Sequence, residues 1–284
     1  LRRLDAAAQI SGDGAWTAPP SWRPCVFRPD EPGDVDVSIV VPTYGDGVLL
    51  LDALASVERC RPPATELVIV NDGSSDAETQ RILVALRERG WFVLDKPNGG
   101  LSSARNAGIA QTRGRYILPL DADNRLRPGF VEAAVALLDD DSSVGVAYGD
   151  RQLFGASGAI VNVPAFDLAR MLGGNYVDAC AVHRRHLWHD VGHYDEAMTG
   201  LEDWEYWIHA GSQGWGFERL DVVAFDYRVR PDSLITRSLR PSKRRELTGR
   251  VLQKHGALLH QHVPRLLRVA STIFGRALPA SWRR

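Results

Sequence analysis

Short apolar segments alternate with amphipathic segments four times between residues 37 and 138, and this alternation limits the possible folds more than any other feature. Four apolar segments predict buried strands, at residues 37–41, 67–70, 91–94 and 116–120. Helices with one apolar stripe are expected after them, at residues 48–60, 76–89, 102–111 and 128–138. Alternation with short links predicts an α/β fold, in which helices flank both faces of a mostly parallel sheet.

The second half of the chain has a more mixed pattern. Strands are expected near 177–182, 217–220 and 222–228, and helices near 203–210 and over 241–270. Local signals place Asp76 and Ser102 at N-caps, Pro128 in a first turn and Gly90 after a helix end. The chain therefore divides into a linker or wrapping extension at 1–35, an α/β domain at 36–235 and a basic, helical segment at 236–284.

Composition excludes several protein classes. Hydrophobic residues make up 44% and charged residues 24% of the chain, values of a globular protein rather than a disordered or fibrous one. No segment has 18 uninterrupted apolar residues, so no transmembrane helix is expected, and the first residues show no secretory signal. Cys25, Cys60 and Cys180 lie far apart, which favours reduced thiols and a cytoplasmic location.

Charge is distributed unevenly along the chain. Residues 231–284 hold 12 Lys and Arg against two acidic side chains, whereas residues 1–230 hold 22 against 33. Apolar residues among these cations suit an amphipathic helix that binds peripherally to the inner face of an anionic membrane. They are Leu247, Val251, Leu258, Leu259, Val263 and Leu266. Packing on the acidic body is the alternative, and nucleic acid is not expected as a partner because that body would repel it.

Polar residues gather where the four expected strands end, at residues 43–44, 71–74, 98–100 and 121–123. Ligands of parallel sheets bind beyond the carboxyl ends of the strands, so these loops predict one cleft. The carboxylates of Asp121 and Asp123 flank a single residue and can bind a hard cation, although an Asx turn would use the same residues.

Other residues of these loops can bind a ligand. Asp72 can accept a hydrogen bond from a base or a ribose hydroxyl, although its turn also suits a helix entry. Gly99 and Gly100 allow the backbone to approach a ligand closely, and Arg105 can reach a phosphate or a base.

Two clusters in the second half carry both structural and functional interpretations. Thr199 and Glu202 have capping-box spacing, whereas Asp203 would lie in a first helical turn, where a lowered pKa would keep it ready to accept a proton. Four histidines have the spacing of zinc ligands on a helix, but no Cys or carboxylate completes the set, so zinc is disfavoured. They are His183, His186, His189 and His193. The nearby tryptophans favour a core over a sugar platform.

Taken in order, the motifs resemble the inverting family 2 glycosyltransferases with a GT-A fold. The resemblance covers residues 37–233 and rests on Ser-Ile-Val-Val-Pro-Thr-Tyr at 38–44, Val-Ile-Val-Asn-Asp-Gly-Ser-Ser-Asp at 68–76, Asn-Gly-Gly at 98–100 with Ala-Arg-Asn at 104–106, Leu-Asp-Ala-Asp at 120–123 and Glu-Asp at 202–203. Residues 192–196 read Gly-His-Tyr-Asp-Glu where the family usually has Gly-Gly-Phe-Asp-Glu. The resemblance implies a Rossmann-like nucleotide-sugar-binding half at 36–125 and a mixed acceptor half at 126–235.

The resemblance also implies roles for individual residues. The nucleotide-sugar would be bound by Pro42, Thr43, Tyr44, Asp72, Gly99, Gly100, Arg105, Asp121 and Ala122. Asp121 and Asp123 would hold Mn²⁺ or Mg²⁺, and Asp203, with Glu202 beside it, would deprotonate an acceptor hydroxyl. The implied reaction moves one sugar with inversion from a UDP- or dTDP-sugar to a glycan, lipid-linked or small-molecule acceptor, in surface polysaccharide or glycoconjugate synthesis.

Two departures from the family pattern matter. Arg230 stands where many relatives carry a metal-binding His, and a guanidinium cannot ligate a metal. It can instead bind diphosphate oxygens, or pair with Asp226 or Asp232. No Gln-x-x-Arg-Trp motif follows Asp203, which disfavours a processive synthase of the cellulose type.

Two other functions are weighed against this one. A sugar-1-phosphate nucleotidyltransferase would need a cation in the loop after the first strand, and residues 42–47 have none. A non-catalytic nucleotide-sugar-binding module of a larger protein would not need the four carboxylates that remain, at Asp72, Asp121, Asp123 and Asp203.

Overall fold

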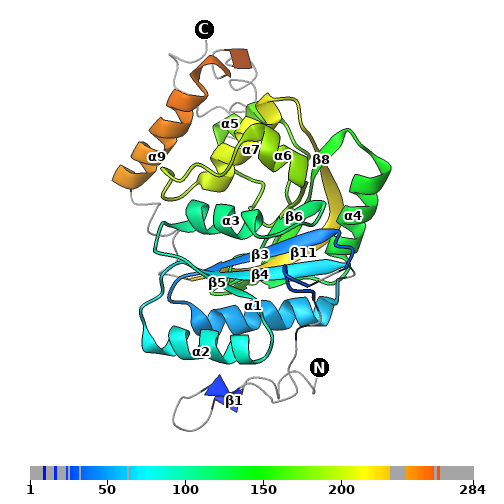
Figure 1. Cartoon of the computed structure of the whole chain (residues 1–284). Helices are drawn as coiled ribbons and strands as arrows, with labels where there is room; N and C mark the ends of the chain where they lie inside the picture. Colours follow the sequence, from blue (N-terminus) through cyan, green and yellow to red (C-terminus); the bar gives the residue numbers. More distant parts are fainter. Residues whose placement is uncertain are drawn as a thin grey trace.

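A computed structural model of the chain has one nine-stranded sheet with helices packed on both faces (Figure 1). The structure describes residues 24–230 except 25, 32 and 63, residues 241–258, 261 and 262, and two short paired strands, β1 (Gln9–Ile10) and β2 (Trp16–Thr17). The large sheet contains β3 (Val37–Thr43), β4 (Thr65–Asn71), β5 (Val93–Asp95), β6 (Tyr116–Pro119), β7 (Arg125–Leu126), β8 (Val144–Gly155), β9 (Ile160–Val161), β10 (Val182–Arg184) and β11 (Gly216–Val229). The helices are α1 (Gly47–Cys60), α2 (Ala77–Glu88), α3 (Leu101–Ala110), α4 (Phe130–Asp140), α5 (Leu168–Gly173), α6 (Arg185–Val191), α7 (Glu202–Ser212) and α9 (Pro241–Lys254).

Strands β5, β4, β3 and β6 lie side by side in that order and are parallel. Their register sets Thr43 beside Asn71 and Val40 beside Pro119, so the carboxyl ends of the strands meet at one edge. β10 runs antiparallel between β6 and β8, and β11 pairs with β8 in parallel. The expected strands of the first half and the mostly parallel sheet are therefore confirmed.

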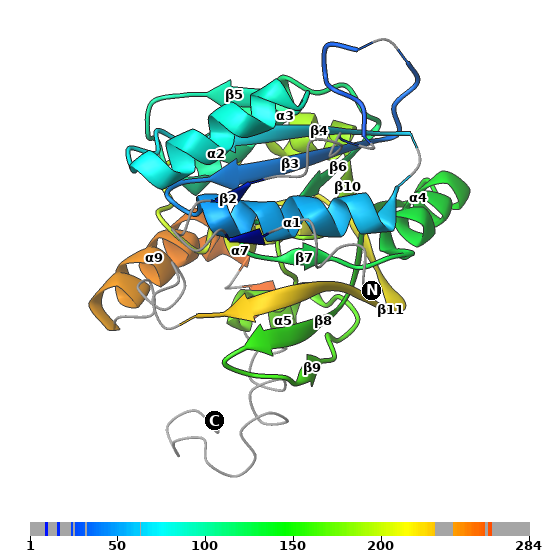
Figure 2. The same ribbon diagram turned by 90° about the horizontal axis from the view of Figure 1, so that it is seen from below.

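Each face of the sheet is covered by its own buried cluster. Helices α1, α2 and α4 pack on one face, where Leu54, Leu83 and Phe130 have no exposed surface. Helices α3, α5, α6, α7 and α9 pack on the other face, around residues such as Trp207. Figure 1 shows α1 and α2 on one side of the sheet and α3 and α7 on the other, and Figure 2 views the molecule from the side of α1 and α2.

Several expected element boundaries were wrong. Gly100 and Gly129, both at φ 84°, are the N-caps of α3 and α4, so Ser102 is not a cap and Pro128 lies before its helix. Three expectations about strands also differ from the structure. The strand expected at 91–94 is β5 at Val93–Asp95, and the strand expected at 177–182 is β10 at Val182–Arg184. The two strands expected within 217–228 form the single strand β11. Strand β8 was not expected at all.

The C-terminal helix α9 packs on the body rather than presenting an apolar face outward. Leu247 and Val251 have no exposed surface and belong to the cluster around α7. The prediction that these two residues belong to a membrane-binding apolar face is thus wrong, because their side chains lie in the core. Leu259, Val263 and Leu266 lie outside the described residues. Within the part of the chain that the structure describes, no helix is long and apolar enough to cross a bilayer.

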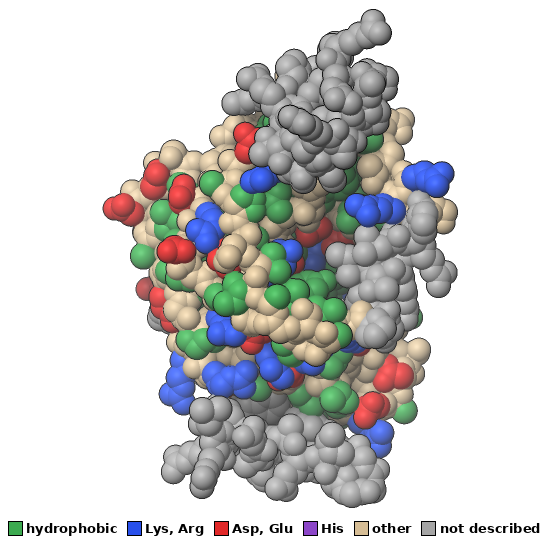
Figure 3. Space-filling model, turned by 180° about the vertical axis from the view of Figure 1, so that it is seen from behind, with side chains coloured by type: hydrophobic (Ala, Val, Ile, Leu, Met, Phe, Trp, Pro, Cys, Tyr) green, Lys and Arg blue, Asp and Glu red, His purple; other side chains and the backbone are tan. Residues whose placement is uncertain are grey.

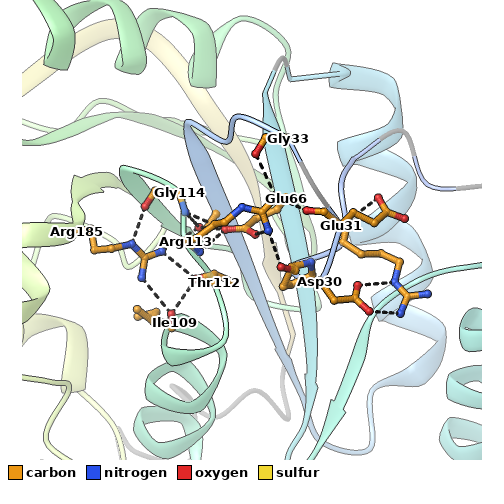
Figure 4. A network of polar contacts seen from close by, with 12 residues as sticks. Asp30, Glu31, Gly33, Glu66, Ile109, Thr112, Arg113, Gly114 and Arg185 are labelled. Carbon is orange, nitrogen blue, oxygen red and sulfur yellow. Dashed lines mark hydrogen bonds and ion pairs between the residues drawn. The ribbon is translucent and has the colours of Figure 1, made fainter.

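The start of the described body is fixed to the amino-terminal edge of the sheet. Phe27 forms a bridge with Glu66, and the Arg113 side chain donates to the carbonyls of Pro29, Glu31 and Gly33. This supports the wrapping alternative for this part of residues 1–35. Beside it, buried Glu66 accepts from the Ser38 hydroxyl at 2.6 Å and from the backbone N–H groups of Arg113 and Gly114 (Figure 4).

Replacing Glu66 by Ala is expected to destabilise the fold by about 3 kcal/mol, because three buried donors lose one acceptor. Urea unfolding of the variant measures this loss, and Glu66→Gln, which keeps the acceptor oxygen, should lose less. Glu88→Ala on the exposed face of α2 is the matched control and should change little. Equal stability of the Glu66 and Glu88 variants would contradict this role of Glu66.

Candidate active site

The loops after β3, β4 and β6 open into a cleft of about 1190 Å³. Residues 173–179, the first turn of α7, the end of β11 and part of α9 complete its walls. The predicted site residues that line it are Pro42, Thr43, Tyr44, Asp72, Gly100, Arg105, Asp121, Ala122, Asp123, Glu202, Asp203 and Arg230. Gly99 does not line the cleft, but its backbone N–H binds Asp72. The predicted convergence of the four loops is confirmed.

Asp72 fixes the glycine-containing loop beside it. Its carboxylate accepts from Lys96 Nζ at 2.6 Å and from the backbone N–H groups of Gly99 and Gly100 at 3.0 and 2.8 Å. Gly73 must be glycine here, because its φ is +76° and a Cβ would lie 2.8 Å from the Asn98 nitrogen. Asp72 therefore shapes the cleft floor, and its contact with a base or ribose stays a prediction.

Arg105 joins two acidic parts of the cleft. Its Nη2 lies 2.7 Å from Asp121 Oδ1, and its Nη1 lies 2.6 Å from Glu202 Oε1, with the guanidinium buried. Burial opposes the charge of Arg105, but Asp121 and Glu202 outweigh it and hold its pKa well above the ordinary value. In this structure Arg105 positions two carboxylates, and its contact with phosphate stays a prediction.

Glu202 does not form the expected capping box. Helix α7 begins at Glu202 itself, after Leu201 in a left-handed conformation with φ 59°, and no side chain caps it. The Glu202 side chain instead binds Arg105 in the interior. Its structural alternative as a cap is wrong, because the helix starts two residues later than a Thr199 N-cap would require.

Asp203 presents a half-buried carboxylate to the cleft. Its Oδ2 accepts from Asn175 Nδ2 and its Oδ1 from the backbone N–H of Trp204, both at 2.8 Å. Burial, followed by the charges of Glu202 and Asp178, raises the pKa of Asp203 to about 8. The expected lowering of this pKa is wrong, since burial among acidic neighbours outweighs the helix terminus.

Arg230 reaches the Asp121–Asp123 loop from the end of β11. Its Nη1 lies 2.9 Å from Asp46 Oδ1 and its Nη2 lies 3.2 Å from Asp123 Oδ2. The expected alternative partner Asp226 is instead bound by Arg127 at 2.6 Å, and Asp232 lies outside the described residues. Burial and the neighbouring Asp121 raise the pKa of Asp123 to about 6.

Sequence reasoning missed several residues that organise this cleft. Arg228 donates from Nε to the backbone carbonyl of Asp123 at 2.9 Å, and its backbone N–H binds Asn124. Asp178 lines the wall next to Asp203, and burial raises its pKa. Arg228 could have been found as part of the arginine pair at the end of β11, but the segment around Asp178, expected as a strand, is an irregular loop.

Part of the chain that forms the cleft matches a known protein family. Residues 38–171 match the model of glycosyl transferase family 2, and this range contains β3, β4, β6 and the Asp121–Asp123 loop. Residues 38–171 are therefore assigned to glycosyltransferase family 2. A chondroitin synthase of Pasteurella multocida is 24% identical over 73% of this chain and 22% of its own length. An uncharacterized protein of Sinorhizobium fredii, y4gI, is 27% identical over 77% of this chain and 25% of its own length.

A solved structure shares the fold. TarS of S. aureus (residues 1–349), determined in complex with UDP-GlcNAc, aligns with a TM-score of 0.61 and 21% identity over 71% of this chain and 61% of that one. The GT-A fold is therefore confirmed for this family 2 chain. The chain spans about a quarter of the length of the two curated relatives.

The two carboxylates of this family 2 cleft fit a hard divalent cation. Among the described residues, Asp121 contacts Arg105 through Oδ1 alone and Asp123 contacts Arg230 through Oδ2 alone, so each has a second carboxylate oxygen for a cation. One or two carboxylates with substrate phosphates are a usual Mg²⁺ set. Within the described ranges, no three His, Cys, Asp or Glu side chains gather as a metal site. Of the four histidines with zinc-like spacing, His193 stacks on Trp188, with the ring centroids 4.0 Å apart.

Proposed function

We propose that this family 2 chain transfers one sugar, with inversion, from a UDP- or dTDP-sugar to a hydroxyl of a glycan, lipid-linked or small-molecule acceptor, in surface polysaccharide or glycoconjugate synthesis. The arrangement around Arg105 is the main support. One guanidinium binds both Asp121, of the proposed metal pair, and Glu202, the neighbour of Asp203. The donor diphosphate and the proposed base would therefore meet within one cleft, as single displacement requires.

Asp121 and Asp123 would hold Mn²⁺ or Mg²⁺. When bound, the cation supplies positive charge that stabilises the diphosphate leaving group. Asp203 takes the proton from the acceptor hydroxyl, with Asn175 and the Trp204 N–H holding its carboxylate in place. Lys96, Gly99 and Gly100 hold Asp72 in position to meet the nucleoside.

A panel of nucleotide-sugars tests the donor class. We expect UDP- or dTDP-sugars, with Mg²⁺, to raise the melting temperature and to be slowly hydrolysed, since binding to the folded state stabilises it. The UDP-GlcNAc complex of TarS makes that sugar the first member to test. Neither binding nor hydrolysis of any panel member would overturn the proposal.

The pH profile is expected to follow Asp203. Its pKa is raised to about 8, so below that pH the carboxyl is protonated and cannot accept a proton. We expect kcat to rise with pH and to level off near pH 8, measured at saturating donor and cation. Below the pKa, kcat should fall by about tenfold for each pH unit. A kcat that stays constant between pH 6 and 9 would contradict the assignment of Asp203 as the base.

Arg230→Ala is expected to weaken UDP about tenfold and UMP much less, because only the diphosphate carries the second phosphate. Calorimetric titration of both nucleotides measures the difference. Arg127→Ala is the matched control, since Arg127 pairs with Asp226 in a comparable ion pair away from the residues lining the cleft. Equal effects of Arg230→Ala on UDP and UMP would place Arg230 outside the donor site.

A further inference from the structure

Helix α9 contributes to the wall of the active-site cleft. Arg244 and Thr248 line the cleft together with Asn175, Asp203 and the loop before α7. The helix lies outside residues 38–171, the range that matches the family model. Its cleft residues are therefore features that the family match does not account for.

Contacts with α7 fix the position of α9. Leu247 and Val251 are fully buried in the cluster that contains Trp204 and Tyr206 of α7. Lys254 Nζ and His255 Nε2 each lie 2.9 Å from Glu205 Oε1, and Glu205 is two residues after the proposed base. Arg244 thus enters the cleft from the layer that carries Asp203, on the side where an acceptor hydroxyl must lie.

Two arginines of the cleft differ from the others in their partners. Arg105 and Arg230 each bind carboxylates. Among the described residues, Arg244 and Arg151 have no carboxylate within 4.0 Å, although both line the cleft. Arg151 lies over the Tyr227 ring at 5.9 Å, and its charge offsets part of the rise in the pKa of Asp178 that burial causes.

Figure 3 shows both acidic and basic side chains on one face of the molecule. Arg244 is exposed at the wall of the cleft, and Arg151 is half-buried. A guanidinium group beside a ligand cleft and without a carboxylate neighbour can bind an anion of the ligand. The donor diphosphate is expected at the ends of β3, β4 and β6, near Arg230. The anion that meets Arg244 therefore belongs to the acceptor.

We propose that the acceptor carries an anionic group, a sugar carboxylate or a phosphate, and that Arg244 and Arg151 bind it. The inference rests on the proposed transferase function. It names a substrate class, because a neutral glycan would leave Arg244 and Arg151 without an anionic partner. The two arginines would position the acceptor so that one of its hydroxyls reaches Asp203.

Binding of matched probes tests this inference, with UDP and Mg²⁺ present. The probes are a disaccharide of glucuronic acid and N-acetylglucosamine, the neutral disaccharide N,N′-diacetylchitobiose, and the pair of glycerol phosphate trimer and glycerol. We expect at least one anionic probe to bind about tenfold more tightly than its neutral counterpart. The pair of probes that shows this preference tells whether the anionic group of the acceptor is a carboxylate or a phosphate.

Arg244→Gln and Arg151→Gln are expected to weaken the preferred anionic probe about tenfold, with the neutral probes as reference. Arg245→Gln is the matched control, because Arg245 is as exposed as Arg244 on the same helix but is absent from the lining of the cleft. Equal binding of charged and neutral probes, no binding of either anionic probe, or an equal loss in Arg245→Gln would overturn the inference. Failure of the proposed function would differ, because UDP itself would not bind.

Discussion

Replacing Asp203 by Asn is expected to lower kcat by about 10²–10⁴ while the affinity for UDP stays nearly unchanged. The amide keeps the size of the side chain and can still accept from the Trp204 N–H, but it cannot take a proton at pH 8. The Asn175 amide can rotate to present its oxygen to the new amide group, so the local hydrogen bond is retained. Initial rates of sugar transfer or donor hydrolysis, with calorimetric UDP binding, measure both parts.

Asp140→Asn provides the matched control, since it makes the same chemical change on an exposed residue at the end of α4 and should leave kcat unaltered. Glu202→Gln tests the neighbouring carboxylate, which binds Arg105. A larger loss of kcat in Glu202→Gln than in Asp203→Asn would show that the two roles are reversed.

Asp203→Asn should also make the protein more stable near neutral pH. The folded state raises the pKa of Asp203 to about 8, so the carboxyl lowers folding stability progressively as pH rises from its unfolded value toward 8. Asp203→Asn has no carboxyl group whose ionisation lowers folding stability. Its melting temperature is therefore expected to exceed that of the wild type, most clearly at pH 8. A higher melting temperature with lower kcat would mark a functional rather than a structural carboxylate.

Asp123→Ala is expected to lower transfer by about 10²-fold or more, because charge stabilisation of the leaving group by a cation is worth several kcal/mol. Excess chelator should abolish transfer by the wild type, and Mg²⁺ or Mn²⁺ should restore it. The fold should persist, since Arg230 keeps Asp46 as a partner when Asp123 is removed. Rates measured across a cation titration give the comparison.

Asp123→Ala removes both a proposed metal ligand and a partner of Arg230, and Asp46→Ala separates these two effects. It also removes one partner of Arg230 but leaves Asp121 and Asp123 in place, so its dependence on cation concentration should resemble that of the wild type. Full activity of the wild type in excess chelator would refute the assignment of Asp121 and Asp123 to a metal.

The first half of the fold could be predicted from sequence because its strands are continuous apolar runs and its loops carry Gly, Asn and Asp. Strand β8 could not, since Gly145 and Gly149 weaken its strand pattern. The structure explains both glycines by close packing: a Cβ would lie 2.5 Å from the Trp215 ring at Gly145 and 2.7 Å from the Val222 carbonyl at Gly149. Such contacts join distant segments and leave no local signal.

In the site, too, local features were predictable and contacts between distant segments were not. The positions of Asp72, Asp121 and Asp123 at strand ends were predictable, because parallel strands bring their carboxyl ends together. The partners of Arg105 were not, since Asp121 and Glu202 reach it from separate parts of the chain. The direction of the Asp203 pKa shift also depends on burial beside Glu202 and Asp178, which a helix-end argument cannot include.

The stereochemistry of donor hydrolysis tests the central claim most directly. Proton NMR of UDP-α-GlcNAc incubated with the protein and Mg²⁺ should show UDP release with β-GlcNAc as the first anomer, because water replaces the acceptor in a single displacement from the opposite face. The signal should disappear in Asp203→Asn and in excess chelator. First release of the α anomer, or release that persists in both controls, would contradict inverting transfer that depends on Asp203 and a cation.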